Sequence, residues 1–234
     1  MTFAVRAAAA TDQGLGRSNN EDSVFVGNRL FVVADGMGGL PAGELASDIL
    51  VQALAVVDDM PDTGEPLQDL LAALRTANER IEAAIADDGA RDGMGTTVTA
   101  LLLSGDAVAA LNVGDSRCYL VRDGSLTQLT RDDTYVQALV DQGVLTPDDA
   151  RRHPQRALVT QAVQGGPFRP AGRMVPVRAG DRPEDDRQAV STSQTMTDTL
   201  SGAPASSVRL ISSAAHASGS VMLRSVSPIT SSVT

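Results

Sequence analysis

The spacing of apolar and polar positions predicts a regular succession of short strands and longer helices over the first 182 residues. Apolar runs of strand length predict strands at 4–9, 23–26, 29–34, 96–103, 107–113, 117–121 and 126–129. Helical spacing predicts amphipathic helices at 42–58 and 67–86 and short helices at 133–142 and 147–152. The buried face of the first helix is expected to carry Leu45, Ile49, Ala53 and Val56. This order favours a layered α+β domain with an antiparallel sheet.

The pattern changes after residue 182. By count, 19 of the 52 residues in 183–234 are Ser or Thr, and none is aromatic. Only Ser206–Ile211 resembles a strand, and it is short. Because such a segment buries little apolar area, we interpret 1–182 as a domain and 183–234 as a Ser/Thr-rich, disordered tail.

Charge and cysteine content narrow the function. The chain carries 19 basic and 29 acidic residues, a net charge of −10, which argues against a nucleic-acid or anionic membrane surface. Cys118 is the single cysteine, so an intrachain disulfide and a cysteine-rich metal site are excluded. The N-terminal apolar run is too short for a signal peptide, and no run suggests a membrane span, so a cytoplasmic protein is expected.

One acid stands at the end of an apolar strand, in the sequence VVADGMGG. Asp35 would be held rigidly there, and Gly36 would let a peptide carbonyl approach a cation with no Cβ in the way. A hairpin turn is the alternative, because Asp-Gly is a common turn signal. A nucleotide-binding loop is disfavoured, because the glycines have neither P-loop nor dinucleotide spacing.

Two further segments carry candidate chemistry. GRSNNED supplies Arg17, whose planar fork suits a phosphate, and the hard oxygen donors Glu21 and Asp22. Asp115 follows another apolar strand, in the sequence VGDSR. Each also has a plain structural interpretation: a solvated polar loop for the first segment and a hairpin turn for the second.

Taken in order, the motifs closely resemble those of the metal-dependent type 2C (PPM) protein serine/threonine phosphatases, above all the bacterial members that oppose Ser/Thr kinases. The motifs are GRSNNED, VVADGMGG, MGTTVTALLL, NVGDSRCYLVRDG, LTRDDTYVQALVDQG and HPQR, and the resemblance runs from about residue 5 to Arg182. It implies a four-layer α-β-β-α sandwich of two antiparallel sheets flanked by helices, here incomplete at the C-terminus. It also implies a cleft for two Mn²⁺ or Mg²⁺ ions, and phosphorylated proteins, Ser/Thr kinases and their substrates, as partners.

The resemblance assigns roles to individual residues. Asp35 matches the acid that bridges both metals, and Gly36 the residue whose carbonyl binds one of them. Glu21 and Asp22 match positions that bind metal directly or through water, and Arg17 matches the phosphate-binding arginine. A metal-activated water would then hydrolyse phosphoserine or phosphothreonine.

Other matches concern the surroundings of the cleft. Asp115 matches an acid that helps to hold a third, weaker metal. Residues 131–156 match the flap that influences substrate choice, and this segment contains Asp132, Asp133, Thr134 and His153. Met37 stands where some members carry a histidine acid, so water would have to protonate the leaving group. Cys118 is expected to be a core residue.

The resemblance ends at Arg182. The family continues with a Ser-Asp-Gly-Leu-like motif and a Gly-Gly-x-Asp-Asn-like motif that supply further metal-binding acids, but no Asp-Gly pair follows Arg182 here. We hypothesise a shift of reading frame near codon 182, which translation of the other two frames would test. The alternative to an active phosphatase is a catalytically inactive phosphatase-like module that binds phosphoproteins, or a non-functional frameshifted product.

Overall fold

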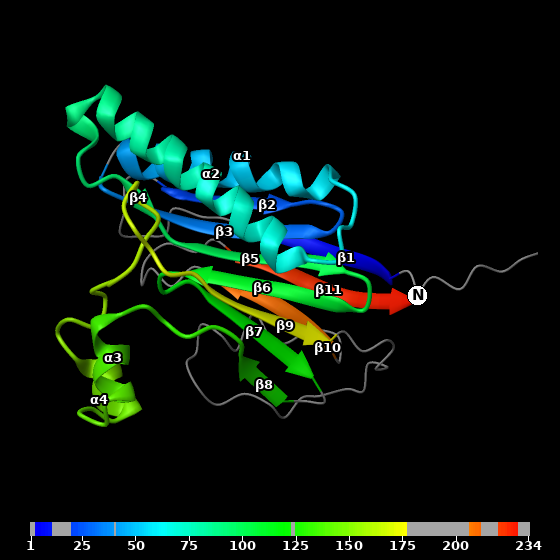
Figure 1. Ribbon diagram of the computed structural model, residues 1–234. Helices are drawn as coiled ribbons and strands as arrows, with labels where there is room; N and C mark the ends of the chain where they lie inside the picture. Colours follow the sequence, from blue (N-terminus) through cyan, green and yellow to red (C-terminus); the bar gives the residue numbers. More distant parts are fainter. Residues whose placement is uncertain are drawn as a thin grey trace, which may run out of the picture.

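The computed structural model describes residues 3–10, 20–39, 41–122, 125–176, 206–211 and 220–228. Two antiparallel sheets pack face to face, and two long helices cover the outer face of one of them (Figure 1). Two shorter helices project from the side. The expected sandwich of antiparallel sheets with flanking helices is confirmed. Within the described residues, helices cover one sheet only, so three of the four expected layers are present.

The six-stranded sheet is built almost entirely from the predicted strands. Its path runs through β2 (Asp22–Val26), β3 (Leu30–Met37), β5 (Val98–Ser104), β6 (Ala107–Val113) and β9 (Ala171–Pro176), with β4 (Gly95–Thr96) paired to the end of β3. The predicted strand 96–103 is therefore divided at Thr97. Strand β9 was not predicted, because as an edge strand it buries only Val175, which leaves no apolar pattern to detect.

Helices α1 (Ala42–Asp59) and α2 (Pro66–Asp87) pack on this sheet and on each other, and the 3₁₀ turn η1 (Gly89–Arg91) follows α2. Three of the four positions predicted for the buried face of α1 contact the core: Ala53 is buried, and Leu45 and Ile49 are partly buried against it. The fourth was wrong, because the centre of the buried stripe lies about one residue further along. Val56 is 59% exposed, whereas the buried stripe carries Ala46, Leu50, Leu54 and Val57. Small residues at 46 and 53 allow α1 to lie close to β3, and Leu50 and Leu54 then fill the space between them.

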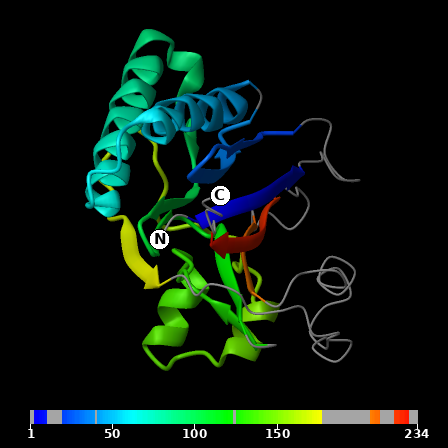
Figure 2. The same ribbon diagram turned by 90° about the vertical axis from the view of Figure 1, so that its right-hand side faces the viewer.

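The five-stranded sheet joins strands from the two ends of the chain. Its order is β1 (Phe3–Ala10), β11 (Ser220–Pro228), β10 (Ser206–Ile211), β7 (Arg117–Arg122) and β8 (Ser125–Gln128). Figure 2 shows β1 in blue beside β11 in red. The core between the two sheets includes Phe31, Leu101 and Cys118. Cys118 is fully buried, and burial raises the pKa of its thiol to about 12.

Two segments of the tail differ from the disorder that we expected. Strand β10 coincides with the one short candidate, Ser206–Ile211, and β11 was not predicted. Both strands pair along their backbones, β10 with β7 and β11 with β1 and β10. Pairing needs only backbone donors and acceptors, so existing edges at β1 and β7 can recruit segments whose composition is unpromising. The rest of 183–234 lies outside the described residues.

The segment expected to form the flap contains helices α3 (Tyr135–Asp141) and α4 (Pro147–Arg152), close to the predicted ranges. They form the projecting part at the lower left of Figure 1. Among the described helices, none combines the length and apolar character that crossing a membrane requires.

One carboxylate closes the turn between β2 and β3. The side chain of Asp58, near the end of α1, accepts hydrogen bonds from the backbone N–H groups of Asn28, Arg29 and Leu30, each at 2.8 Å. A Cβ on Gly27 would lie 2.3 Å from Asp58 Cγ, so this turn needs glycine. Partial burial raises the pKa of Asp58, but hydrogen bonds from these backbone groups and the charge of Arg29 outweigh it and hold the pKa below 3.8.

Replacing this carboxylate should destabilise the fold. We expect Asp58→Ala to lower the free energy of unfolding by about 1–2 kcal/mol, because three backbone donors lose their acceptor while partial exposure screens the charge. The lowered pKa means that the contribution is fully present above pH 3.8 and disappears as pH falls through the folded-state value. Urea unfolding of both proteins between pH 3 and 7 measures this, with Asp59→Ala as the control. An equal loss in the control would refute the assignment.

The tail strands should be required for folding. Deleting residues 183–234 removes β10 and β11, which separates β1 from β7 and leaves unpaired sheet edges. We expect the shortened chain to aggregate and to lose its cooperative thermal transition. Size-exclusion chromatography and far-UV circular dichroism measure both properties. Deleting only 229–234 leaves both strands intact and is the control; a monomeric, cooperatively folding 1–182 fragment would contradict the expectation.

Candidate functional site

Two of the candidate acids lie at the same end of the six-stranded sheet. Strands β3 and β6 both run antiparallel to β5, which lies between them, so they run in the same direction. Asp35 lies near the end of β3 and Asp115 follows the end of β6. With neighbouring strands about 4.8 Å apart, the two backbones are separated by about 10 Å at this edge.

Asp22 and Asp35 face each other across β2 and β3. They are directly opposite in the register of the two strands, and each residue is only 8% exposed. Glu21 precedes them at 9% exposure. Carboxylates at such low exposure need partners or counter-ions, because an uncompensated buried charge is costly. The structure therefore brings Glu21, Asp22 and Asp35 to neighbouring positions of one sheet edge.

Gly36 is required here for a reason that the sequence did not reveal. Its N–H donates to the Glu21 carbonyl at 3.1 Å, and a Cβ on Gly36 would lie 2.1 Å from the Gly43 carbonyl oxygen and 2.7 Å from that of Glu21. The end of β3 thus touches the first turn of α1 with no space for a side chain. The Ser47 hydroxyl, also on α1, donates to the Glu21 carbonyl at 2.7 Å.

The Glu21 side chain occupies the opposite side of the same junction. A Cβ on Gly43 would lie 2.3 Å from Glu21 Oε2, so the carboxylate fills the space that a larger residue would need. The first turn of a helix carries partial positive charge, which favours a carboxylate at this position. The space left by Gly43 and the partial charge of the helix terminus therefore both favour the observed position of the Glu21 carboxylate.

The oxygen donors at this site are of the type that a hard divalent cation prefers. It consists of carboxylates with a peptide carbonyl within the same short stretch, and Mg²⁺ and Mn²⁺ prefer such oxygen ligands. In the described ranges, however, no group of three or more His, Cys, Asp or Glu side chains is placed to hold a metal ion. The described residues thus supply part of a metal site. Arg17, the candidate phosphate ligand, lies outside them.

The Asp115 turn is held by the base of the flap. Gly114 adopts a φ of +100°, which favours glycine, and Asp115 itself is half-buried. The Gly114 N–H donates to Asp133 Oδ2 at 3.0 Å, and the Gly114 carbonyl accepts from the Asp133 N–H at 2.9 Å. Asp133 therefore binds this turn through its backbone and its side chain at once.

Asp132 anchors the flap to β7. Its carboxylate accepts from Arg117 Nε at 2.9 and 3.0 Å and from Gln128 Nε2 at 3.0 Å, and Asp132 is 6% exposed. Hydrogen bonds to Asp132 raise the pKa of the Arg117 guanidinium despite its partial desolvation. Arg117 was not singled out from the sequence. Its position two residues after the candidate Asp115 was the one feature of the sequence that could have drawn attention to it.

Thr134 and His153 shape the flap itself. Thr134 caps α3, its side chain accepting from the Gln137 N–H at 3.2 Å, and the Tyr135 N–H donates to the Leu158 carbonyl at 2.9 Å. His153 follows α4; its Nδ1 accepts from the Gln155 N–H at 3.1 Å, and its ring centroid lies 6.1 Å from that of Tyr135. These contacts stabilise the flap itself, and an isolated bridge between Thr134 and Val159 joins the two ends of the segment, which form its neck.

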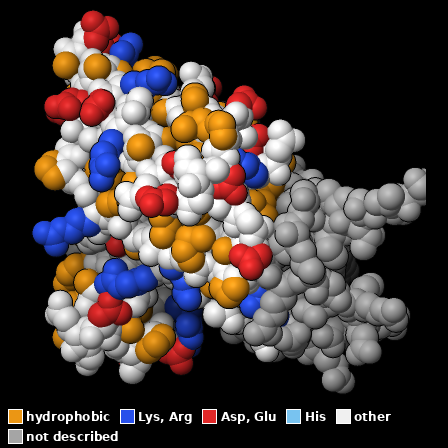
Figure 3. All heavy atoms as spheres, turned by 45° about the vertical axis from the view of Figure 1, so that its right-hand side comes forward, with side chains coloured by type: hydrophobic (Ala, Val, Ile, Leu, Met, Phe, Trp, Pro, Cys, Tyr) orange, Lys and Arg blue, Asp and Glu red, His pale blue; other side chains and the backbone are white. Residues whose placement is uncertain are grey.

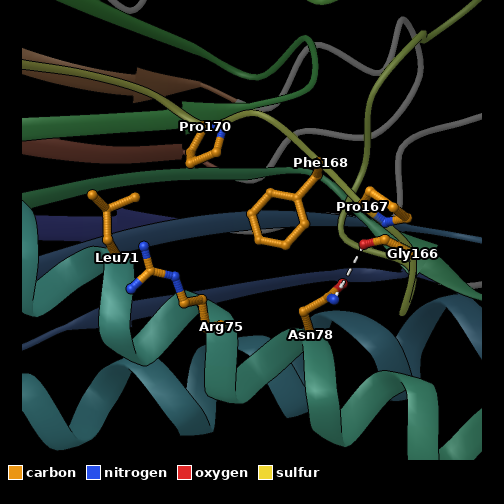
Figure 4. Close-up of a pocket in the computed structure, with 7 residues that line it drawn as sticks. All are labelled: Leu71, Arg75, Asn78, Gly166, Pro167, Phe168 and Pro170. Carbon is orange, nitrogen blue, oxygen red and sulfur yellow. Dashed lines mark hydrogen bonds between the residues drawn. The ribbon is translucent and has the colours of Figure 1, made fainter.

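A pocket of about 280 Å³ lies elsewhere, between α2 and the loop before β9 (Figure 4). Asn78 holds this loop on the helix, accepting from the Gly165 N–H at 2.9 Å and donating to the Gly166 carbonyl at 3.2 Å. Arg75 and Phe168 contribute to its lining.

Carboxylates and guanidinium groups are interspersed over the face shown in Figure 3, so charge is not segregated there.

Comparison with known proteins places the chain among phosphatases. A family model for protein phosphatase 2C matches residues 16–165. The serine/threonine protein phosphatase PstP of Mycobacterium tuberculosis is 50% identical over 182 residues, which are 78% of this chain and 35% of PstP. The chain thus spans about a third of the length of that relative. The protein phosphatase PhpP of Streptococcus pneumoniae is 36% identical over 180 residues, 73% of each chain.

Solved structures of phosphatases also resemble this chain, in agreement with the sequence comparisons. The catalytic domain of PstP in complex with two manganese ions matches with a TM-score of 0.79 and 34% identity, over 97% of this chain and 100% of that one. The crystal structure of the Mycobacterium tuberculosis serine/threonine phosphatase PstP matches with a TM-score of 0.80 and 35% identity, over 94% of this chain and 98% of the other. Both structural matches run well past residue 182. The match of the family model and these identities show that the chain belongs to the protein phosphatase 2C family.

Proposed function

We propose that this protein hydrolyses phosphoserine and phosphothreonine in proteins in a reaction that depends on Mn²⁺ or Mg²⁺. The observation that carries the proposal is the buried pair Asp22 and Asp35, opposed on β2 and β3 in the motif order of the family. The match to the manganese-bound PstP catalytic domain supports the same choice of cofactor. The small number of described donors at this edge makes direct measurement of metal binding and turnover the deciding test.

We assign the residues of the site as follows. Asp35, the Gly36 carbonyl, Asp22 and Glu21 would hold the cations, with Asp115 at the position of a third, weaker ion. When bound, the cations supply positive charge that acidifies water and neutralises phosphoryl oxygens. Glu21 and Gly36 contribute rigidity, because their backbones are locked against α1. Arg17 would orient the phosphate through its planar fork.

The flap would select substrates. Asp132 and Asp133 hold its neck against β7 and the Asp115 turn, while Thr134 and His153 stabilise its two helices. A phosphoprotein segment bound at the sheet edge would therefore meet a surface whose position is set by buried contacts. These residues position the flap and do not themselves act on phosphate.

We also propose how the chain is divided, which substrates and partners it has, and where it acts. We infer that the phosphatase-like sequence covers 1–182, and that the tail 183–234 adds strands β10 and β11 to the five-stranded sheet of the same fold. Phosphorylated proteins are the substrate class that the names of the relatives support, and we propose Ser/Thr kinases and their targets as partners, in the cytoplasm.

A second function is favoured by one observation. The family's C-terminal acid motifs do not follow Arg182, and among the described residues no group of three or more His, Cys, Asp or Glu side chains is placed to hold a metal ion. A chain with half of its metal ligands could bind phosphoproteins without hydrolysing them. The alternative is therefore a phosphoprotein-binding module with the same fold.

A phosphatase assay separates the two functions. With p-nitrophenyl phosphate and a phosphothreonine peptide, we expect turnover that requires Mn²⁺ and that falls by about 100-fold or more in Asp35→Asn, because the cations lose a central ligand. Asp106→Asn, in the exposed β5–β6 turn, is the control and should retain activity. No turnover with retained binding of the phosphopeptide would support the binding module, and neither turnover nor binding would reject both functions.

A further inference from the structure

A single buried hydroxyl group connects the strand of Asp35 to the turn of Asp115. Thr97 Oγ1 accepts a hydrogen bond from the Asp35 N–H at 3.2 Å and lies 2.8 Å from the hydroxyl oxygen of Ser116. Thr97 is 2% exposed and Ser116 is fully buried. Thr97 lies between β4 and β5, where the predicted strand 96–103 is divided.

The remaining atoms of Thr97 contact the same two segments. Its N–H donates to the Asp35 carbonyl at 2.9 Å, so both backbone groups of Asp35 bind Thr97. On the other side, a Cβ on Gly114 would lie 2.7 Å from Thr97 Cβ and Cγ2. The methyl group of Thr97 therefore packs directly on Gly114, and its hydroxyl group bonds to the residue after Asp115.

The Asp115 turn is itself rigid at this point. Thr99 Oγ1 donates to the Ser116 carbonyl at 2.9 Å, and Asn112 Nδ2 donates to the Gly114 carbonyl at 3.2 Å. Thr99 and Asn112 are both almost completely buried. The turn is thus held by groups other than Asp35, and the hydroxyl of Thr97 joins this fixed turn to the backbone of Asp35 at the end of β3.

We propose that Thr97 is a positioning residue for the metal ligands: it sets the place of Asp35 relative to the Asp115 turn. The inference rests on the proposed function, since it concerns the same oxygen donors. Neither the motif order nor the acid spacing assigns this role to a threonine hydroxyl. Partners of metal ligands commonly change metal affinity by about 10–100-fold when they are removed.

The test is Mn²⁺ binding by the full chain after removal of bound metal. Isothermal titration, together with the electron paramagnetic resonance signal of free Mn²⁺, gives an affinity that does not depend on turnover. We expect Thr97→Val, which keeps the shape and removes the hydroxyl, to weaken Mn²⁺ binding by about 10-fold or more. Thr97→Ser keeps the hydroxyl and should restore an affinity close to that of the unmodified chain.

A matched control separates positioning from stability. Thr130 Oγ1 accepts from the Cys118 N–H at 3.0 Å, the same kind of bond in the other sheet. Thr130→Val should lower the melting temperature while leaving Mn²⁺ affinity unchanged. Ser116→Ala removes the partner hydroxyl and should weaken Mn²⁺ binding in the same direction as Thr97→Val, which keeps the test open if Thr97→Val does not fold.

The outcomes are distinct. If the unmodified chain binds Mn²⁺ and both Thr97→Val and Ser116→Ala bind it equally well, the positioning role is refuted and the proposed function stands. If the unmodified chain binds no Mn²⁺, both the proposed function and this role are refuted. If Thr97→Ser is as defective as Thr97→Val, the methyl packing on Gly114 and not the hydroxyl is responsible, and the role as proposed is refuted.

Discussion

The structure depends on the close approach of three backbone segments where α1 meets β2 and β3. Gly36, Gly43 and Glu21 meet with no space for a side chain on either glycine. This contact sets the height of α1 on the sheet, and with it the apolar stripe that packs below the helix. It also determines where the acids lie, because Glu21, Asp22 and Asp35 belong to the same segments. The same backbone contacts therefore determine both how α1 packs on the sheet and where the candidate metal ligands lie.

Much of this organisation could be predicted from the sequence, because strong apolar periodicity defines α1, α2 and most strands of the six-stranded sheet. The exact stripe of α1 could not, since small residues such as Ala46 bury without a strong hydrophobic signal. Strand β9 has almost no apolar pattern, and Gly36 looked like a ligand position when its steric role is equally strict. Thr97 escaped notice because nothing in a single sequence shows which buried hydroxyl groups meet.

The tail shows how differently architecture and chemistry depend on sequence. Strands β10 and β11 complete a sheet through backbone pairing, which many sequences can satisfy. A metal-binding carboxylate, by contrast, requires Asp or Glu at one particular position, and a similar overall composition does not replace it. A chain can thus retain the outline of a phosphatase 2C fold while its last 52 residues carry different side chains. Fold similarity past residue 182 is therefore compatible with either proposed function.

Cys118 gives the two-sheet core a built-in chemical reporter. As the only thiol, fully buried on β7 with a pKa raised to about 12, it is almost entirely protonated and shielded at neutral pH. Because Cys118 is fully buried, alkylating reagents reach it only when the core around it opens, so the rate of its modification measures that opening. The chain thus carries its own probe of local opening in this core. The probe lies on β7, next to β10, one of the two strands that the tail supplies.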